Sequence, residues 1–260
     1  MSRTRLPAVA GYFYPELADE LRRAVVNYLD QAERRLSAPK AIIAPHAGYI
    51  YSGAVAASAY ACIAPAHASI TRVIVLGPAH RVYLRGLALC SAESFTTPLG
   101  RIPVDQEVIE YIRDLPQIVT MDRAHALEHS LEVQLPFLQM VLDQFSLVPL
   151  VIGEASPEAV SEVLVRLWGG RETLIVVSSD LSHYYDYATA KVLDQETSRN
   201  IEALRSDISP ERACGCMPLN GLLYLAKQHG LQVTTLDLRN SGDTAGPRDQ
   251  VVGYGAYAIP

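Results

Sequence analysis

The sequence is poor in cysteine. It contains only four cysteines, Cys62, Cys90, Cys214 and Cys216, and none is spaced as Cys-x-x-Cys. This argues against a disulfide framework and against the common paired-cysteine metal and redox motifs. Cys214 and Cys216 are two residues apart, so their side chains would diverge on a helix, which disfavours a metal site between them.

Long hydrophobic runs, basic clusters and low-complexity linkers are also absent. The longest stretch of small apolar residues, 53–64, is too short to cross a bilayer and is followed by Pro65. The first twenty residues have no apolar segment typical of a secretory signal. Lys and Arg are scattered and the net charge is −6, which argues against nucleic acid as a partner. We therefore expect a cytoplasmic protein with no membrane or nucleic-acid partner.

A single domain over residues 1–260 is the simplest interpretation of the length and composition. The chain is 49% hydrophobic, which is ample for one large core, and it contains no internal repeat.

Apolar strands alternate with helical patterns along the chain. The expected strands are 41–45, 71–78, 147–153, 173–180, 231–240 and 251–259, and the expected helices are 16–35, 53–64, 128–142, 156–168, 186–206 and 210–230. Residues 87–105 are expected to form strand, turn and strand, and their part 93–105 is expected to be an antiparallel addition to a parallel core. This order predicts an α/β fold, a mostly parallel central sheet with helices on both faces.

Reactive side chains follow four of these strands at their carboxyl ends. His46 follows the first strand, His80 the second, and Asp180 and His183 a later one. Ser241, Gly242 and Asp243 follow a fourth. Ligands of open α/β sheets bind outside the carboxyl ends of the strands, so these residues are predicted to share one pocket.

His46 and His80 together favour a metal site. If their strands are neighbours, about 4.8 Å apart, the two imidazoles can converge on one ion. The alternative is that each is a loop histidine hydrogen-bonded to a backbone carbonyl.

Asp180 and His183 are three residues apart and can point the same way from one turn. They are candidates for a base with its orienting carboxylate, or for metal ligands. Alternatively, Asp180 or Ser182 caps the helix that follows. No Gly-x-Ser-x-Gly elbow supports a serine nucleophile.

Further candidates surround these residues. His129 lies between acidic residues at an expected helix start. It either joins the pocket or is only a solvated side chain at that end of the helix. Tyr12, Tyr49 and Tyr51 follow glycines and are candidates for substrate binding, although they could equally pack as aromatic side chains.

Five motifs, taken in order, resemble the Memo family: LPAVAGYFYP, IIAPHAGYIYSG, VIVLGPAH, EHSLEVQLPFLQ and VSSDLSHYYDY. The resemblance extends from about Arg5 to the final strand. It implies a fold like that of the class III extradiol dioxygenases, which use non-haem iron(II). It also implies that His46 and His80 are metal ligands and that Asp180, His183 and His129 line the pocket.

The resemblance also bears on the third ligand and on partners. Eukaryotic members supply a cysteine before the last strand, and counting back from that strand assigns this position to Thr244, a poor metal ligand. Either His183, Asp180 or Asp243 would then complete the site, or the chain has lost the metal site. Prokaryotic members are associated with a radical-SAM protein and an AMMECR-type protein, which implies these as pathway partners.

Three functions are compatible with these features. The first is a metal-dependent oxidoreductase using iron(II) or copper held by His46, His80 and His183, with Asp180, His183 and His129 as catalytic residues. The second is a protein that binds a peptide or small anion in the same pocket without turnover. The third is a metal-dependent hydrolase.

Overall fold

The computed structural model describes residues 3–33 and 38–260. Within them, nine strands form one sheet in the order β10-β12-β2-β9-β3-β8-β4-β7, with β11 also paired to β12. The bounds are β2 (Ala41–Ala44), β3 (Arg72–Pro78), β4 (Leu87–Leu89), β7 (Ile118–Thr120), β8 (Ser146–Ile152), β9 (Thr173–Ser178), β10 (His183–Tyr185), β11 (Thr234–Asn240) and β12 (Val251–Ile259).

The centre of this sheet is parallel, as predicted, and its flanks are antiparallel. Strands β2, β9, β3 and β8 run parallel to one another, while β12 is antiparallel to β2, and β4 is antiparallel to β8. The central strands are almost completely buried because both of their faces are covered, and this explains their continuous apolar sequences.

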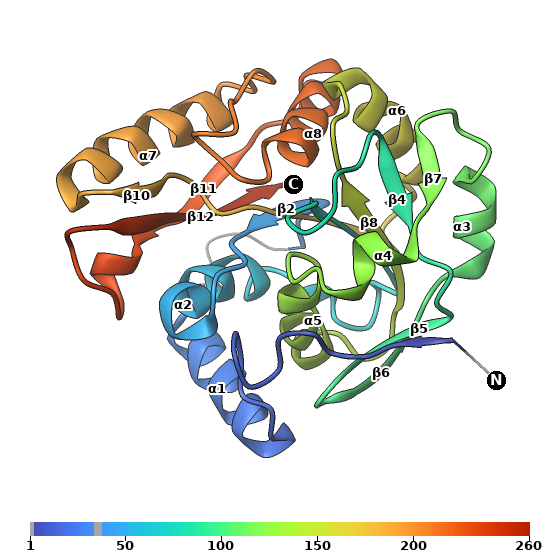
Figure 1. Cartoon of the computed structure of the whole chain (residues 1–260), viewed down its shortest axis with the longest axis horizontal. Helices are drawn as coiled ribbons and strands as arrows, with labels where there is room; N and C mark the ends of the chain where they lie inside the picture. Colours follow the sequence, from blue (N-terminus) through green and yellow to red (C-terminus); the bar gives the residue numbers. More distant parts are fainter. Residues whose placement is uncertain (1–2, 34–37) are drawn as a thin grey trace.

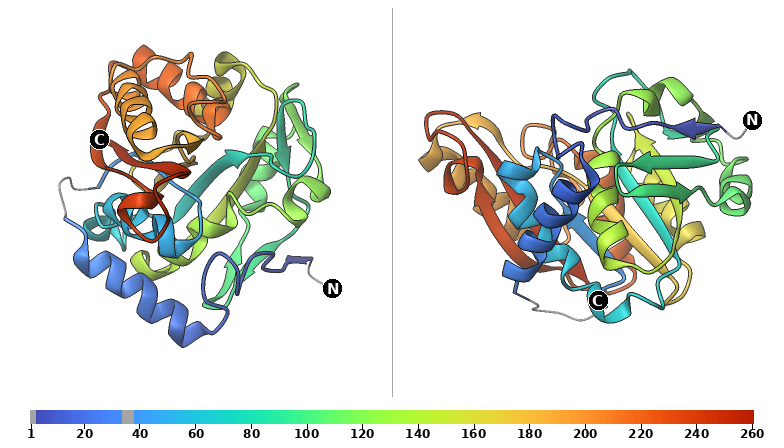
Figure 2. Two further views of the ribbon diagram at one scale, coloured as in Figure 1. Left: turned by 60° about the vertical axis from the view of Figure 1, so that its left-hand side comes forward. Right: turned by 90° about the horizontal axis from the view of Figure 1, so that it is seen from below.

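Helices cover both faces of the sheet, as the fold class requires (Figure 1). Helices α1 (Ala18–Gln31), α2 (Tyr49–Tyr60) and α5 (Leu135–Val141) lie on one side, and α6 (Pro157–Leu167), α7 (Tyr187–Glu202) and α8 (Cys216–Gln228) lie on the other. Viewed from below, α1, α2 and α5 stand together in front of the strands (Figure 2). The short helices α3 (Gln106–Ile112) and α4 (Asp122–Ala126) belong to the region around β4 and β7.

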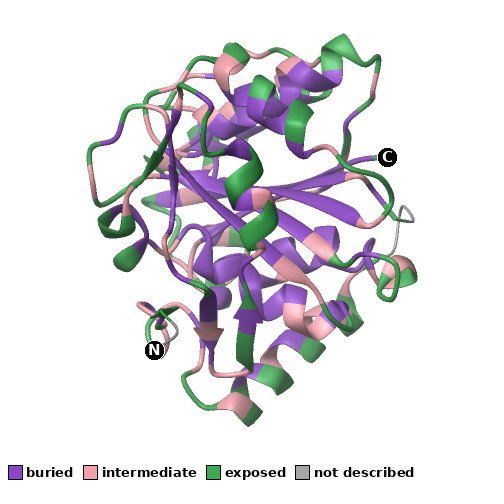
Figure 3. Ribbon diagram, turned by 90° about the vertical axis from the view of Figure 1, so that its right-hand side faces the viewer, coloured by how far each residue is buried: buried purple, intermediate pink, exposed green. Residues whose placement is uncertain are grey.

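Burial follows this layering. Figure 3 shows strands that are buried almost throughout and helices whose outer faces are exposed. Small residues let α1 and α2 approach closely, since a Cβ on Gly53 would lie 2.7 Å from the ring of Tyr28. No helix of the described chain combines the length and hydrophobicity needed to cross a membrane.

The predicted hairpin forms, but in a separate small sheet. Strands β5 (Ser94–Thr97) and β6 (Gly100–Pro103) are antiparallel to each other, and β1 (Thr4–Arg5) pairs with β5. The antiparallel prediction is confirmed. The expectation that the pair extends the parallel core is wrong, because β5 pairs with the N-terminal strand.

The N-terminal segment is fastened to the domain by a buried carboxylate. Glu132 pairs with Arg5, accepts the amides of Ala8 (2.8 Å) and Val9 (3.0 Å), and accepts the hydroxyl of Tyr14 (2.5 Å). These contacts hold the segment that precedes α1, including Phe13, beside the sheet.

Some predicted helix bounds are wrong, and one of these errors matters for the site. The predicted helix 210–230 begins only at Cys216, so residues 210–215 form a loop. A Cβ on Gly215 would lie 2.4 Å from the Ser178 carbonyl oxygen, so the loop packs directly against the end of β9. The helix expected over 128–142 starts later, as the 3-10 turn Glu132–Gln134 followed by α5. The end of the helix expected over 16–35 falls partly outside the described residues.

Candidate metal centre and its pocket

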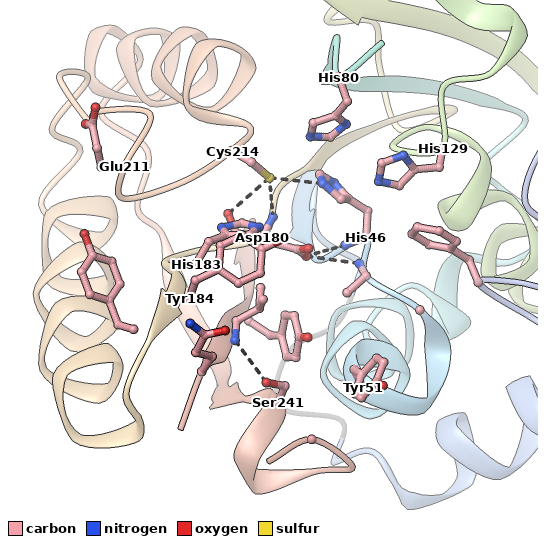
Figure 4. Close-up of a pocket in the computed structure, with 18 of the residues that line it drawn as sticks. His46, Tyr51, His80, His129, Asp180, His183, Tyr184, Glu211, Cys214 and Ser241 are labelled. Carbon is pink, nitrogen blue, oxygen red and sulfur yellow. Dashed lines mark hydrogen bonds between the residues drawn. The ribbon is translucent and has the colours of Figure 1, made fainter. Parts of the chain in front are cut away.

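A pocket of about 860 Å³ opens at the carboxyl edge of the central strands. His46, His80, Asp180 and His183 all line it, so the structure brings together the four residues that the sequence placed at strand ends (Figure 4). His46 follows β2 and His80 follows β3, but β9 lies between these strands. The expectation of adjacent strands is therefore wrong, and the two imidazoles lean toward each other over β9, with ring centroids 5.2 Å apart.

The tautomer of His46 is fixed by its neighbours. Ser178 Oγ donates its single proton to the Ser130 carbonyl oxygen at 2.6 Å, and therefore accepts from His46 Nδ1 at 2.8 Å. Nε2 of His46 is then the ring nitrogen with a free lone pair. Burial, together with the nearby histidines, lowers the pKa of His46, so the ring is neutral, which is the form that binds metals.

His80 has the same arrangement with a different partner. Its Nδ1 donates to Glu128 Oε1 at 2.9 Å, which leaves Nε2 free, and its backbone amide donates to Glu128 Oε2 at 2.6 Å. Burial alone would raise the pKa of Glu128, but hydrogen bonds from His80 and Ser130 outweigh it and hold the pKa at about 2. A charged carboxylate behind a histidine is the usual support of a metal-binding imidazole.

Cys214 completes this group, and sequence reasoning missed it. Its Sγ lies 3.2 Å from His46 Nε2 and accepts the Asp180 amide at 3.3 Å. Its own amide donates to the Asp180 carbonyl oxygen at 3.2 Å, which holds the loop against the end of β9. The usable signal was a cysteine just before a helix start in the segment CGCMPLNG, which the prediction of a continuous helix concealed.

Thr244, the residue assigned to the cysteine position, lies elsewhere. It follows the 3-10 turn Ser241–Asp243, donates its hydroxyl to the Ser241 carbonyl oxygen at 3.2 Å, and is not part of the pocket lining described. Asp243 is also outside this lining: it accepts the Asn240 amide and the Tyr187 hydroxyl. Neither residue is placed to complete a site with His46 and His80.

His46, His80 and Cys214 form one cluster, in which one ligand atom of each lies within 4.8 Å of the others. A second cluster that meets the same distance contains Asp180, His183 and Cys214, so Cys214 is common to both. The candidate ligands are therefore divided between two groups: His183 approaches Cys214 but does not group with both His46 and His80.

His183 has an orientation that leaves one nitrogen free. Its Nδ1 donates to the Leu181 carbonyl oxygen at 2.8 Å, which leaves Nε2 without a hydrogen-bond partner among the described residues. Asp180 Oδ1 accepts the amides of His46 (2.7 Å) and Ala47 (3.3 Å), while burial raises its pKa. Neither Asp180 nor Ser182 caps α7, because Asp186 does so by accepting from the amides of Ala188 and Thr189.

His129 joins the pocket lining from the loop before α5. Its ring stacks on His80 with centroids 4.8 Å apart and contacts Phe13 at 4.7 Å. Nδ1 is buried and has no hydrogen-bond partner among the described residues. Burial is the main reason that its pKa falls to about 4. His129 therefore contributes a neutral imidazole to the wall of the site.

The three candidate tyrosines do not share one location. Tyr51 lines the pocket, whereas Tyr49 is buried and donates its hydroxyl to the Val133 carbonyl oxygen at 2.7 Å. Tyr12 is 88% exposed and outside the pocket lining. Aromatic residues not selected from the sequence complete the wall, namely Phe13, Tyr184, Tyr185 and Tyr254.

The donor set suits a metal ion. Two imidazoles and a sulfur atom lie within 4.8 Å of one another, a combination that zinc, copper and iron accept. Burial raises the pKa of the Cys214 thiol, so an ion would have to displace its proton on binding. The residues present therefore fit such an ion, although they do not select one metal.

Comparisons with known proteins agree with the sequence motifs. A profile described as Memo-like protein matches residues 5–258. The chain belongs to the Memo family. A MEMO1 family protein of Methanosarcina mazei is 36% identical, with 98% of each chain covered. MEMO1 family proteins of Aquifex aeolicus and Thermoplasma volcanium are 35% and 32% identical, with 97% and 96% of each chain covered.

A solved structure supports the fold of this Memo family member. The uncharacterized protein JW3007 from Escherichia coli K12 superposes with a TM-score of 0.54 at 14% identity. The match covers 85% of this chain and 99% of the other. At this level of identity the likeness concerns the fold alone.

Proposed function

We propose that this Memo family protein is a metal-dependent oxidoreductase whose ion is held by His46, His80 and Cys214. The observation that carries the proposal is the convergence of two imidazoles and one thiol in the lining of a large pocket. Three protein ligands leave coordination positions for a substrate, as in catalytic rather than structural metal sites. Iron(II) or copper is the proposed metal.

When bound, such an ion would supply one-electron chemistry and a Lewis-acidic position for a substrate oxygen. The chain would supply the rest. His183 groups with Cys214 and keeps its Nε2 free, so we assign it the role of taking or returning a proton there. Asp180 holds the backbone amides of His46 and Ala47, so we assign it a positioning role. His129 and Phe13 line the pocket beside His80.

Metal titration separates this proposal from its alternatives. Protein stripped of metal would be titrated anaerobically with iron(II), copper(I) and zinc, and the iron and copper forms would then be taken through an oxidation and reduction cycle. The proposal expects tight binding of iron or copper, retention of the ion in both oxidation states, and loss of binding in His46→Ala and His80→Ala. The control is His67→Ala, because His67 is not among the residues that line the pocket.

Other outcomes would favour the other functions. If the protein binds zinc tightly but neither iron nor copper, and no redox cycle is seen, the result would favour a metal-dependent hydrolase that uses His183 and Asp180. Absence of any tight metal binding would favour a protein that binds a peptide or small anion without turnover. The partnership with a radical-SAM protein and an AMMECR-type protein, and a cytoplasmic location, stay predictions.

A further inference from the structure

The pocket lining includes one arginine, Arg81, that has no hydrogen-bond or ion-pair partner among the described residues. Arg81 directly follows His80 and is the only Lys or Arg among the described residues that line the pocket. Its guanidinium makes no hydrogen bond or ion pair within the described chain, whereas Arg85, four residues further on, pairs with Glu154. An exposed arginine without a partner beside a candidate metal site is available to bind an anionic group of a ligand.

The acidic groups near the site do not neutralise Arg81. Glu128 is engaged by His80 and by the Ser130 amide, and Asp180 by two backbone amides. Glu211 lines a different wall, away from His80 (Figure 4). A pocket lined by one guanidinium and two carboxyl groups matches a singly charged carboxylate better than a dianionic phosphate, which would need a second cation.

A strained aromatic residue stands at the other end of the site. Tyr184 has a φ of 63°, although it is not glycine, and its side chain is 71% exposed. The strand register shifts between His183 and Tyr185, which places Tyr184 in this conformation. Left-handed backbone at a bulky residue costs on the order of 1 kcal/mol. The ring keeps an edge contact with His183, at 5.7 Å between centroids, while most of its surface stays exposed. A ring held in this way at a pocket wall is suited to stack on a ligand.

These two residues bracket the candidate metal centre. Arg81 adjoins His80, Tyr184 adjoins His183, and Cys214 groups with both of these histidines. The Cys214 thiol therefore lies close to the histidine that adjoins each of these two residues.

We propose that the pocket binds a small organic carboxylate with a planar ring, its carboxylate on Arg81 and its ring on Tyr184. This rests on the proposed function in one respect, that such a ligand would be the substrate of the metal centre. Its binding to the metal-free protein does not depend on that function.

The test uses probe ligands that separate the contribution of the negative charge to affinity from that of the aromatic ring. Metal-free protein is titrated with benzoate, benzamide and phenylphosphonate, and with the corresponding naphthalene acid and amide, by calorimetry or ligand-observed NMR. We expect the acids to bind about tenfold or more tightly than the amides, as a charge-assisted bidentate contact implies. Phenylphosphonate should bind more weakly than benzoate.

Two variants divide the contributions. Arg81→Gln should remove the preference for acid over amide and leave the affinity for the amides unchanged. Tyr184→Gly should lower the affinity for acids and amides alike, and it also relieves the strained φ. The controls are Arg85→Gln and Tyr83→Ala, since both side chains are exposed and outside the pocket lining. Neither should change any affinity.

Several results would overturn the proposal. Equal affinity for acid and amide, no binding of either acid, tighter binding of phenylphosphonate, or an unchanged preference in Arg81→Gln would each do so. A preference that appears only in zinc-loaded protein would mean that the carboxylate binds the ion rather than Arg81. Failure of the proposed metal function is seen separately, as an absence of tight metal binding in wild-type protein.

Discussion

The Sγ atom of Cys214 lies 3.2 Å from Nε2 of His46, although the two residues are 168 positions apart in the chain. The contact exists because residues 210–215 form a loop that packs on the end of β9, beside the end of β2. It turns a pair of histidines into a group of three potential ligands.

Replacing this cysteine should abolish tight metal binding. Cys214→Ser removes one of three ligands, so affinity for copper(I) or zinc should fall by more than the 10- to 100-fold that losing a supporting residue typically costs. Competition with a chromophoric chelator measures this. Cys216→Ser is the matched control, because Cys216 is buried in α8 and should leave affinity unchanged. Equal loss in both variants would contradict the assignment.

Thr244→Cys should not strengthen metal binding. The Thr244 side chain is tied to Ser241 and lies outside the pocket lining, so a thiol there would not reach an ion held by His46 and His80. The same chelator competition tests it. A clear gain in affinity would restore the assignment made by counting back from the last strand.

Glu128 should act through His80. Glu128→Gln removes the negative charge from the carboxylate that accepts His80 Nδ1, so metal affinity should fall about 10- to 100-fold while the fold persists. Glu154→Gln, a surface acid paired with Arg85, is the control. Circular dichroism of both variants would show whether a loss of affinity reflects unfolding, and unchanged affinity in folded Glu128→Gln would refute the role.

Gly253 makes room for a buried carboxylate. A Cβ at this position would lie 2.0 Å from Asp194 Oδ2, and Asp194 Oδ1 accepts the amide of Ser182, next to His183. Gly253→Ala should therefore destabilise the protein by roughly 1–3 kcal/mol, as overpacking usually does. Urea unfolding measures the change.

A double-mutant cycle tests the cause of that loss. If the clash is with Asp194, Asp194→Ala should cost less in the Gly253→Ala background than in wild type, with a coupling energy of about 0.5–3 kcal/mol. Additive effects would place the strain elsewhere.

His125 should make stability depend on pH. It is buried and donates Nε2 to the Ala88 carbonyl oxygen, and burial lowers its pKa from 6.5 to about 4. A lowered pKa means that protonation favours the unfolded chain. His125 therefore contributes its full stabilisation above pH 6.5 and loses up to about 3 kcal/mol as the pH falls from 6.5 through 4.

Comparison with His125→Gln isolates this contribution. The glutamine amide can still donate to Ala88 but does not titrate in this range. Urea unfolding at several pH values should therefore give a shallower decline for the variant than for wild type between pH 6.5 and 4. Parallel curves would show that the histidine titrates normally in the folded protein.

Local sequence determined much of the fold. Continuous apolar segments of strand length could only be strands covered on both faces, and their alternation with helices required a layered α/β domain. It also determined which end of the sheet carries the chemistry, because His46, His80, Asp180 and His183 each follow a strand directly, and chain direction is a local property. The Memo motifs carried the family assignment.

Tertiary structure decided the composition of the site. The insertion of β9 between β2 and β3 depends on long-range strand pairing, which no local pattern encodes. The helical pattern of residues 210–230 gave no sign that the helix begins only at Cys216, or that Gly215 in the preceding loop packs against Ser178 and Ser179. The free Nε2 atoms of His46, His80 and His183 depend on acceptors supplied by the folded chain, Ser178, Glu128 and the Leu181 carbonyl. Sequence thus supplied the reactive groups, whereas ligand identity and ring orientation depend on contacts between residues far apart in the chain, which exist only after folding.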